Sequence, residues 1–109
     1  VLLAREQGLA NFSIVSNQVT VPAAVRALLD APETRLDAFI APGHVSLVTG
    51  SRPYGFMAAD YGKPVVISGF EPTDLLQATL MILRQQREGR CTVENQYRRA
   101  VAPDGNPRA

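Results

Sequence analysis

The stretch KPVVISGFEPTDLLQATLMILRQQREG (63–89) constrains the fold more than any other part of this sequence. Its residues 65–68 form a short, mostly apolar run that is typical of a buried strand. A glycine-containing turn follows, and Pro72 begins a helix that carries Arg84 and Arg87 near the negative end of its dipole. One face of this helix repeats at about 3.6 residues and consists of Leu75, Leu76, Thr79, Leu80 and Leu83. The stretch therefore predicts one βα unit of a parallel sheet.

The same order of strand and helix recurs earlier in the chain. A strand is predicted at Phe12–Ser16, and a helix at Pro22–Asp30 follows it. The apolar stripe of that helix, which we expect to face a sheet, is Val25, Leu28 and Leu29. A second strand is predicted at Ala38–Ala41, with short helical segments starting at Val45 and Ser51. The predicted fold is α/β, a three-layer αβα arrangement with a small parallel sheet built from βα repeats.

The sequence has the features of a piece of a larger multidomain protein. It opens inside a helical stretch, VLLAREQG, that no strand precedes, and no initiator methionine begins it. Three predicted strands also make a thin sheet. We expect residues 1–90 to be a partial α/β domain of βα repeats, and residues 91–109 to be an extended segment or linker toward further sequence.

Charge and hydropathy exclude several classes of protein. Eleven basic and ten acidic residues give a net charge of +1, and no Lys/Arg run is dense enough for a nucleic-acid binder. The apolar stretch around 75–83 is far shorter than the roughly 20 residues that span a bilayer, and no signal-peptide pattern opens the chain. We therefore expect a cytoplasmic protein without membrane or nucleic-acid partners. Its single cysteine, Cys91, supports neither an internal disulfide nor a complete metal site, and its role stays open.

Polar residues follow each predicted strand at the point where it ends. The three segments are 16–18, 42–44 and 69–71. Because the carboxyl ends of parallel strands share one edge of a sheet, ligands bind in the crevice beside them. An amide from Asn17, the only imidazole, His44, and the carboxylate of Glu71 are therefore predicted to converge there. Gly43, before His44, permits a close approach of the backbone.

Each of these residues also has an ordinary structural interpretation. His44 can be a helix-start residue bonded to a neighbouring loop, and Glu71 an N-cap or first-turn carboxylate. Gly43 can be a turn glycine, and Asn17 can form an Asx turn. The segment ENQYRR is most often a solvated edge, although Tyr97 with Arg98 beside it can be a partner contact; these alternatives stay open. No G-x-G-x-x-G or G-x-x-x-x-G-K-[ST] loop is present, which argues against a classical dinucleotide site.

Three motifs in this order resemble one known family. They are APGHVS at 41–46, GFEPTDLL at 69–76, and VENQYRRAV at 93–101 with DGN after it. Together they resemble the hydrogenase maturation factor HypD family over essentially the whole chain, in the region of its second α/β domain. Thr73 departs from the leucine that is more usual in the GFEPLD form of the motif, at a helix position of little consequence.

The resemblance implies a role in assembling the Fe(CN)2CO group of nickel-iron hydrogenases. It implies HypC and HypE as protein partners, and a scaffold or redox partner more than a turnover enzyme; whether this chain catalyses a step stays open. The family's cysteine motifs and its [4Fe-4S] ligands lie outside this region, so we expect no cofactor in this chain. Within this picture His44 faces a cleft between domains, where it can touch iron, and Glu71 is a second candidate.

Two other classes of function remain as alternatives. One is a small-molecule-binding α/β module that uses Asn17, His44 and Glu71 on a soluble ligand. The other is a protein-docking domain whose 93–101 segment contacts a partner chain. The missing phosphate loop weighs against the first alternative, and the order of the three motifs favours the maturation scaffold over both.

Overall fold

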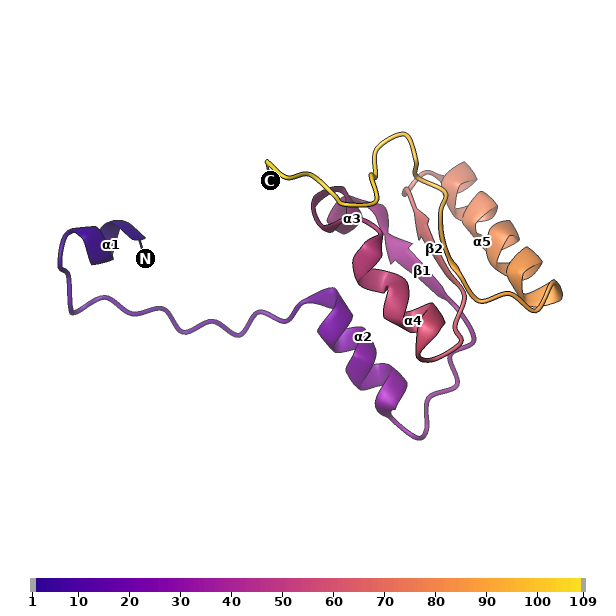
Figure 1. Cartoon of the computed structure of the whole chain (residues 1–109), viewed down its shortest axis with the longest axis horizontal. Coiled ribbons are helices and arrows are strands. Elements are labelled where there is room, and N and C mark those ends of the chain that lie inside the picture. Colours follow the sequence, from indigo (N-terminus) through magenta and orange to yellow (C-terminus); the bar gives the residue numbers. More distant parts are fainter. Residues whose placement is uncertain (1, 109) are drawn as a thin grey trace.

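The computed structural model of the chain describes residues 2–108 as short helices and strands around a small sheet, with principal extents of 59 × 36 × 23 Å (Figure 1). In chain order the elements are α1 (Leu2–Glu6), α2 (Val21–Asp30), β1 (Phe39–Pro42), α3 (Gly43–Thr49), the 3-10 helix η1 (Arg52–Tyr54), α4 (Gly55–Ala59), β2 (Val65–Ser68), α5 (Pro72–Arg87) and β3 (Val93–Asn95). The predicted helix over 22–30 and the helix beginning at Pro72 are confirmed, as is the strand over 65–68. None of the helices between residues 2 and 108 is long and apolar enough to cross a membrane.

The sheet is fully parallel, with β2 between β1 and β3. Phe39 lies opposite Val65, and Val65 lies opposite Val93, so the three strands start level with one another. Strands that start level and are this short also end level. Pro42 therefore lies opposite Ser68, and the loops that leave the carboxyl ends begin side by side. This register is what builds the candidate site.

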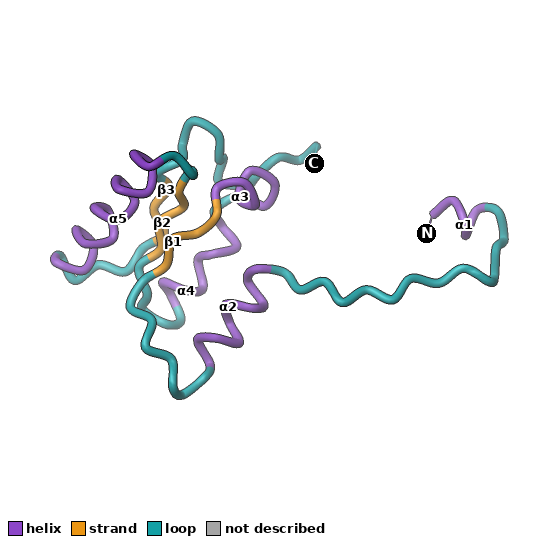
Figure 2. Tube along the Cα trace, turned by 180° about the vertical axis from the view of Figure 1, so that it is seen from behind, coloured by secondary structure: helices purple, strands orange, loops and turns teal. Residues whose placement is uncertain are grey.

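Helices cover both faces of the sheet, which confirms the predicted three layers. Successive side chains of a strand point to opposite faces. Val65 and Ile67 join the main core, together with Tyr54, Met57 and two further buried residues, Ala41 and Val101. Val66, which is fully buried outside that core cluster, points to the other face, where α5 contacts β2. Figures 1 and 2 show α2 and α4 on one side of the sheet and α5 on the other.

The predicted strand over 12–16 is wrong. Residues 9–20 instead form an extended connection between α1 and α2, which runs away from the sheet (Figures 1 and 2). Phe12, Ile14 and Val15 are exposed, and within residues 2–108 no strand pairs with them. An apolar run becomes a strand only when a neighbouring strand accepts its backbone hydrogen bonds, and this run has no such neighbour here.

The third strand comes from the other end of the chain. β3 at Val93–Asn95 pairs with β2, and Val101 after it is buried in the core, so part of the segment that was expected to be extended or a linker belongs to the sheet. One side-chain expectation also changes. Val25 and Leu29 of α2 pack against the core as predicted, but Leu28 is exposed because its position turns it away from the sheet.

Candidate functional site

Three loops meet at the carboxyl edge of the sheet, and we call this edge the rim. His44 lies in the first turn of α3, at the junction that directly follows β1, and Phe70 and Glu71 lie in the loop between β2 and α5. The rings of His44 and Phe70 are 5.1 Å apart, centre to centre, at an angle of 44°. Both side chains are exposed. The structure therefore brings the loops of His44 and Glu71 together, as the register of the strands requires.

Ser46, two residues after His44, fixes the backbone that carries the imidazole. Ser46 is completely buried, and its hydroxyl donates to the carbonyl oxygen of Pro42 at 2.8 Å and lies 3.3 Å from the hydroxyl of Tyr54. This back-bond ties the first turn of α3 to the end of β1. The imidazole consequently projects from a fixed backbone rather than from a free loop.

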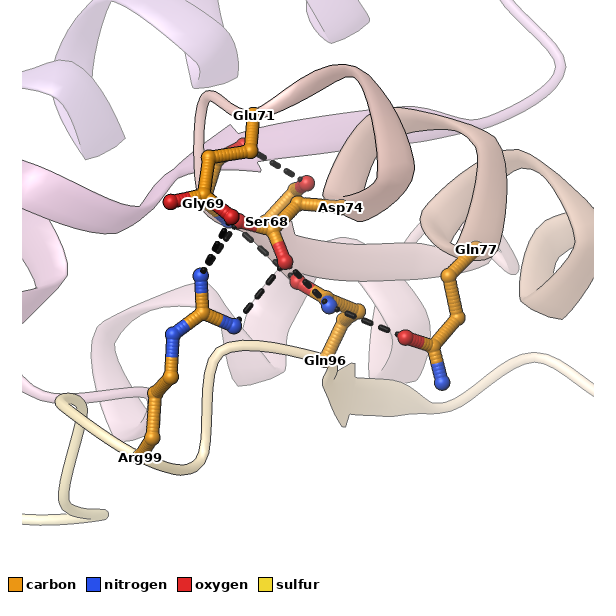
Figure 3. A network of polar contacts seen from close by, with 7 residues as sticks. All are labelled: Ser68, Gly69, Glu71, Asp74, Gln77, Gln96 and Arg99. Atoms are coloured by element: carbon orange, nitrogen blue, oxygen red, sulfur yellow. Dashed lines mark hydrogen bonds and ion pairs between the residues drawn. The ribbon is translucent and has the colours of Figure 1, made fainter.

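A buried carboxylate at the start of α5 organises the second and third loops (Figure 3). The guanidinium of Arg99 donates to both oxygens of Asp74, at 2.9 and 2.6 Å. The side chain of Asp74 is 5% exposed, whereas that of Arg99 is 52% exposed. Glu71 lies on the outer side of the same guanidinium, with its carboxylate 3.6 Å away and 74% of its side chain exposed. Arg99 thus pairs with both acids. Of these two acids, Asp74 is buried and Glu71 is open to solvent.

Gln96 adds a second bridge between the same loops. Its amide nitrogen donates to Asp74 at 2.8 Å and to the amide oxygen of Gln77 at 3.0 Å. Its own oxygen accepts from the backbone N–H of Gly69 at 3.3 Å, and Figure 3 shows this chain of contacts running from the loop after β3 to the start of α5. The loop that follows β3 is therefore bonded to the loop that follows β2 at several points.

Tyr97 fills a slot between two glycines of the rim. A Cβ atom added to Gly43 would lie 2.8 Å from one edge of the Tyr97 ring, and a Cβ added to Gly69 would lie 3.0 Å from the other edge. The Arg99 guanidinium covers the ring at 4.4 Å from its centre. Gly43 and Gly69 are needed here for space, and Tyr97 sets the separation of the two loops that carry His44 and Phe70.

The polar bonds around Asp74 also change its titration. Hydrogen bonds from Arg99 and then from Gln96 lower the pKa of Asp74 from the ordinary 3.8 to about 2, because they stabilise the charged carboxylate. A lowered folded-state pKa means that this contribution to stability is complete above the unfolded pKa, near 3.8. It is lost as the pH falls through about 2.

We therefore expect Asp74→Asn to destabilise the chain in a pH-dependent way. The difference in unfolding free energy between wild type and variant should be constant above a pH of about 5 and shrink steadily between about 4 and 2, because the wild type then loses its charged partner for Arg99. Denaturant titrations at several pH values measure this difference. Asp37→Asn, at an exposed carboxylate near the amino end of β1, is the control. A difference that stays constant down to pH 2 would show that Asp74 is not paired in solution.

The other predicted residues lie elsewhere. Asn17 is in the extended connection between α1 and α2 and does not reach the rim, because the strand that should have carried it is absent. Arg98 is exposed, and its Nε donates to the carbonyl oxygen of Asn95 at 3.1 Å. Tyr97 is partly buried against the core rather than free on the surface. The thiol of Cys91 is exposed at the opposite end of β3, where it lies 2.9 Å from the carbonyl oxygen of Gly62.

The sequence interpretation missed three members of the site, which are Asp74, Gln96 and Arg99. Asp74 has the spacing of an ordinary first-turn acid, and its backbone bond from Glu71 fits that role. The sequence did contain a feature that could have indicated Gln96 and Arg99, since both follow a strand that ends at the rim. That feature was hidden because β3 was not predicted as a definite strand.

The donors of the rim do not make a metal centre by themselves. Between Leu2 and Arg108, no three side chains of His, Cys, Asp or Glu lie close enough to hold a metal ion together. A [4Fe-4S] cluster is held by about four cysteine thiolates, and this sequence has one cysteine, so its residues do not fit such a cluster. The exposed imidazole of His44 can supply one ligand or one hydrogen bond to a group presented from outside.

Comparison with known proteins identifies relatives along the whole chain. The family model HypD, described as the hydrogenase formation hypA family, matches residues 1–109. The hydrogenase maturation factor HypD of Rhodobacter capsulatus is 61% identical over 103 residues, which cover 94% of this chain and 27% of the relative. The hydrogenase expression/formation protein HupD of Azotobacter chroococcum mcd 1 is 54% identical over 111 residues, and the HypD of Escherichia coli K12 is 44% identical over 103 residues. These two alignments cover 97% and 94% of this chain, and 29% and 28% of the relatives.

Proposed function

Because this chain belongs to the HypD family of hydrogenase formation proteins, we propose that it forms part of the scaffold on which the Fe(CN)2CO centre of nickel-iron hydrogenases is assembled. The chain spans less than a third of the length of the relatives, so the activity of the whole protein is a proposal for this region. The iron group is the cargo of this process. We place it over the rim, in a cleft that residues from outside this chain complete.

The observation that carries the proposal is the exposed imidazole of His44 on a rigid base. A neutral imidazole can coordinate iron or donate a hydrogen bond to a diatomic ligand. Such a contact is useful in assembly only if the imidazole is held in place before the cargo arrives. The Ser46 back-bond, the Tyr97 slot and the Asp74–Arg99 pair supply that rigidity. Phe70, whose ring centre lies 5.1 Å from that of the imidazole, adds an apolar contact on one side of it.

Glu71 and the loop after β3 complete the proposed site. The Glu71 carboxylate is exposed and lies beside Arg99, which keeps a negative group at the rim without leaving it unpaired. We further propose that HypC and HypE are the partners of the assembled protein, with Arg98 on the surface nearest to them and Tyr97 supporting that surface from below. The exposed side chain of Arg98 and the partly buried ring of Tyr97 beside it support this assignment.

A chimaera tests the proposal directly. In the HypD of Rhodobacter capsulatus, the matched region is replaced by this chain, and the chimaera is expressed in a strain that lacks its own HypD. We expect hydrogenase activity to return, together with the infrared bands of cyanide and carbon monoxide on the purified hydrogenase. A chimaera that accumulates to the normal level but restores neither signal would contradict the proposed function. The empty vector and the unmodified HypD are the two controls.

A further inference from the structure

The helix α5 has an apolar face that nothing in the described chain covers. Its residues Asp74, Ala78 and Gln85 are buried against the sheet. The leucines predicted to lie along one face do so, but that face points away from the sheet. They are Leu75, 41% exposed, Leu76, 72%, Leu80, 46%, and Leu83, 56%. Thr79 lies among them, and its hydroxyl bonds back to the carbonyl oxygen of Leu75 at 2.9 Å, so only its methyl group remains for contact. We call this surface the leucine face.

Two arginines stand at the carboxyl end of the leucine face. Arg84 and Arg87 line a shallow groove together with Leu80 and Leu83. In the part of the chain that the structure describes, neither arginine forms a salt bridge, although several acids lie at the ends of the same helix. Those acids are already paired. Arg99 holds Asp74 and Glu71, and Arg90 holds Glu88.

We propose that the leucine face is a docking site for an amphipathic helix of another protein, one that carries acidic residues beside its apolar stripe. An exposed apolar patch marks an interaction site, and a row of leucines along one helix can pair with the apolar stripe of a second helix as in a coiled coil. The unpaired arginines select the partner, since a carboxylate placed against Arg84 and Arg87 gains two ion pairs that α5 itself does not offer.

Charge also argues against two of the other possible occupants of this surface, a second copy of the chain and the connection over 9–20. A second copy of the chain would bring leucines and arginines of its own, and the most exposed carboxylate beside its α5, Glu71, already lies 3.6 Å from Arg99. The exposed apolar connection over 9–20 has the sequence LANFSIVSNQVT and contains no charged residue. Either occupant would cover the leucines without placing a further carboxylate beside Arg84 and Arg87. A partner with free acidic side chains satisfies both parts of the surface.

Fluorescence anisotropy with two synthetic peptides tests the proposal on the 109-residue chain. Both peptides are amphipathic helices of about 15 residues with the same leucine stripe. One carries glutamates beside the stripe, and the other carries lysines at the same positions. We expect the glutamate peptide to bind about tenfold more tightly than the lysine peptide at low salt, and the preference to weaken as salt is added. Equal binding of the two peptides, or binding of neither, would overturn the proposal.

Variants of the leucine face locate the binding. Leu80→Asp is expected to abolish peptide binding, and Arg84→Gln with Arg87→Gln to remove only the preference for glutamate. Leu28→Asp, at a leucine of α2 that is 53% exposed, is the matched control and should bind like the wild type. All four side chains are on helix surfaces, and circular dichroism checks that the helices remain. If Leu28→Asp loses binding equally, the peptide does not use the leucine face.

The remaining measurements separate the alternative occupants. Sedimentation should show that the chain without peptide is monomeric; a dimer that Leu80→Asp dissociates would assign the leucine face to a second copy. The chimaera with the Rhodobacter capsulatus protein should bind the glutamate peptide as the chain does. Loss of binding there would mean that the longer polypeptide covers the leucine face itself, which contradicts an external partner. These results do not depend on the rim, so they can fail while the proposed function stands.

Discussion

Replacing His44 by alanine in the chimaera is expected to reduce the amount of matured hydrogenase at least about tenfold, the scale on which metal-site interactions act. The imidazole is exposed at the rim and contacts Phe70, so its loss removes a ligand or hydrogen-bond donor without emptying the core. Hydrogenase activity in cell extracts measures the loss. The thermal unfolding of the 109-residue chain should remain unchanged, which separates a role at the site from a role in folding.

A glutamine variant distinguishes the two possible roles of the imidazole. His44→Gln keeps a hydrogen-bond donor of similar reach but is a poor ligand for iron. Maturation that survives in His44→Gln and fails in His44→Ala would assign a hydrogen bond, and failure of both would assign coordination. Normal maturation by His44→Ala would remove His44 from the site and with it the main support for the rim as the place of assembly.

Gly43→Ala is expected to destabilise the chain by about 2–3 kcal/mol, the scale of overpacking in a closely packed site. A Cβ at this position would lie 2.5 Å from the carbonyl oxygen of Ser68 and 2.8 Å from the ring of Tyr97. Ser68 is part of the central strand and its backbone cannot move without disturbing the pairing with β1. The added methyl group must therefore push apart the loops that carry His44 and Phe70. Denaturant unfolding of the chain measures the cost.

Gly55→Ala is the matched control for this substitution. Gly55 has helical backbone angles, φ −55° and ψ −35°, and a Cβ there would meet no atom within 4 Å. Alanine should stabilise this position by about 0.5–1 kcal/mol, because it reduces the freedom of the unfolded chain. Equal effects of the two substitutions would mean that the slot around Tyr97 is loose in solution. Gly43→Ala should also reduce maturation in the chimaera, since it shifts His44.

The candidate site was predictable where it depends on the ends of strands. β1 and β2 are each followed by their helix, so His44 and Glu71 could be assigned to one edge from their order in the chain. The pairs that make the rim rigid could not. Arg99 is 25 residues from Asp74, and Tyr97 meets Gly43 across about half of the chain. No local pattern distinguishes such an arginine or tyrosine from a solvated one.

The failure at Asn17 has the same origin. The run over 12–16 has the composition of a strand, but strand formation depends on a neighbour that accepts its hydrogen bonds. The third strand of the sheet is instead β3, although its three residues are less typical of a strand than the run over 12–16. A prediction from the sequence alone detects the apolar run, but it cannot detect that no neighbouring strand is available to pair with it. Asn17 was consequently placed at an edge that the chain reaches only from residue 39 onward.

Local chemistry alone was sufficient for α2, β2 and α5, for the α/β class and for the family. Helix periodicity, proline at a first turn and a short buried run act between residues that are neighbours along the chain, and in these three elements the tertiary context agrees with them. Three features required the assembled fold: the choice of third strand, the outward direction of the leucine face, and the glycine slot that holds Tyr97. Each depends on which distant segments come into contact, because packing and strand pairing are properties of the contact and not of either segment by itself.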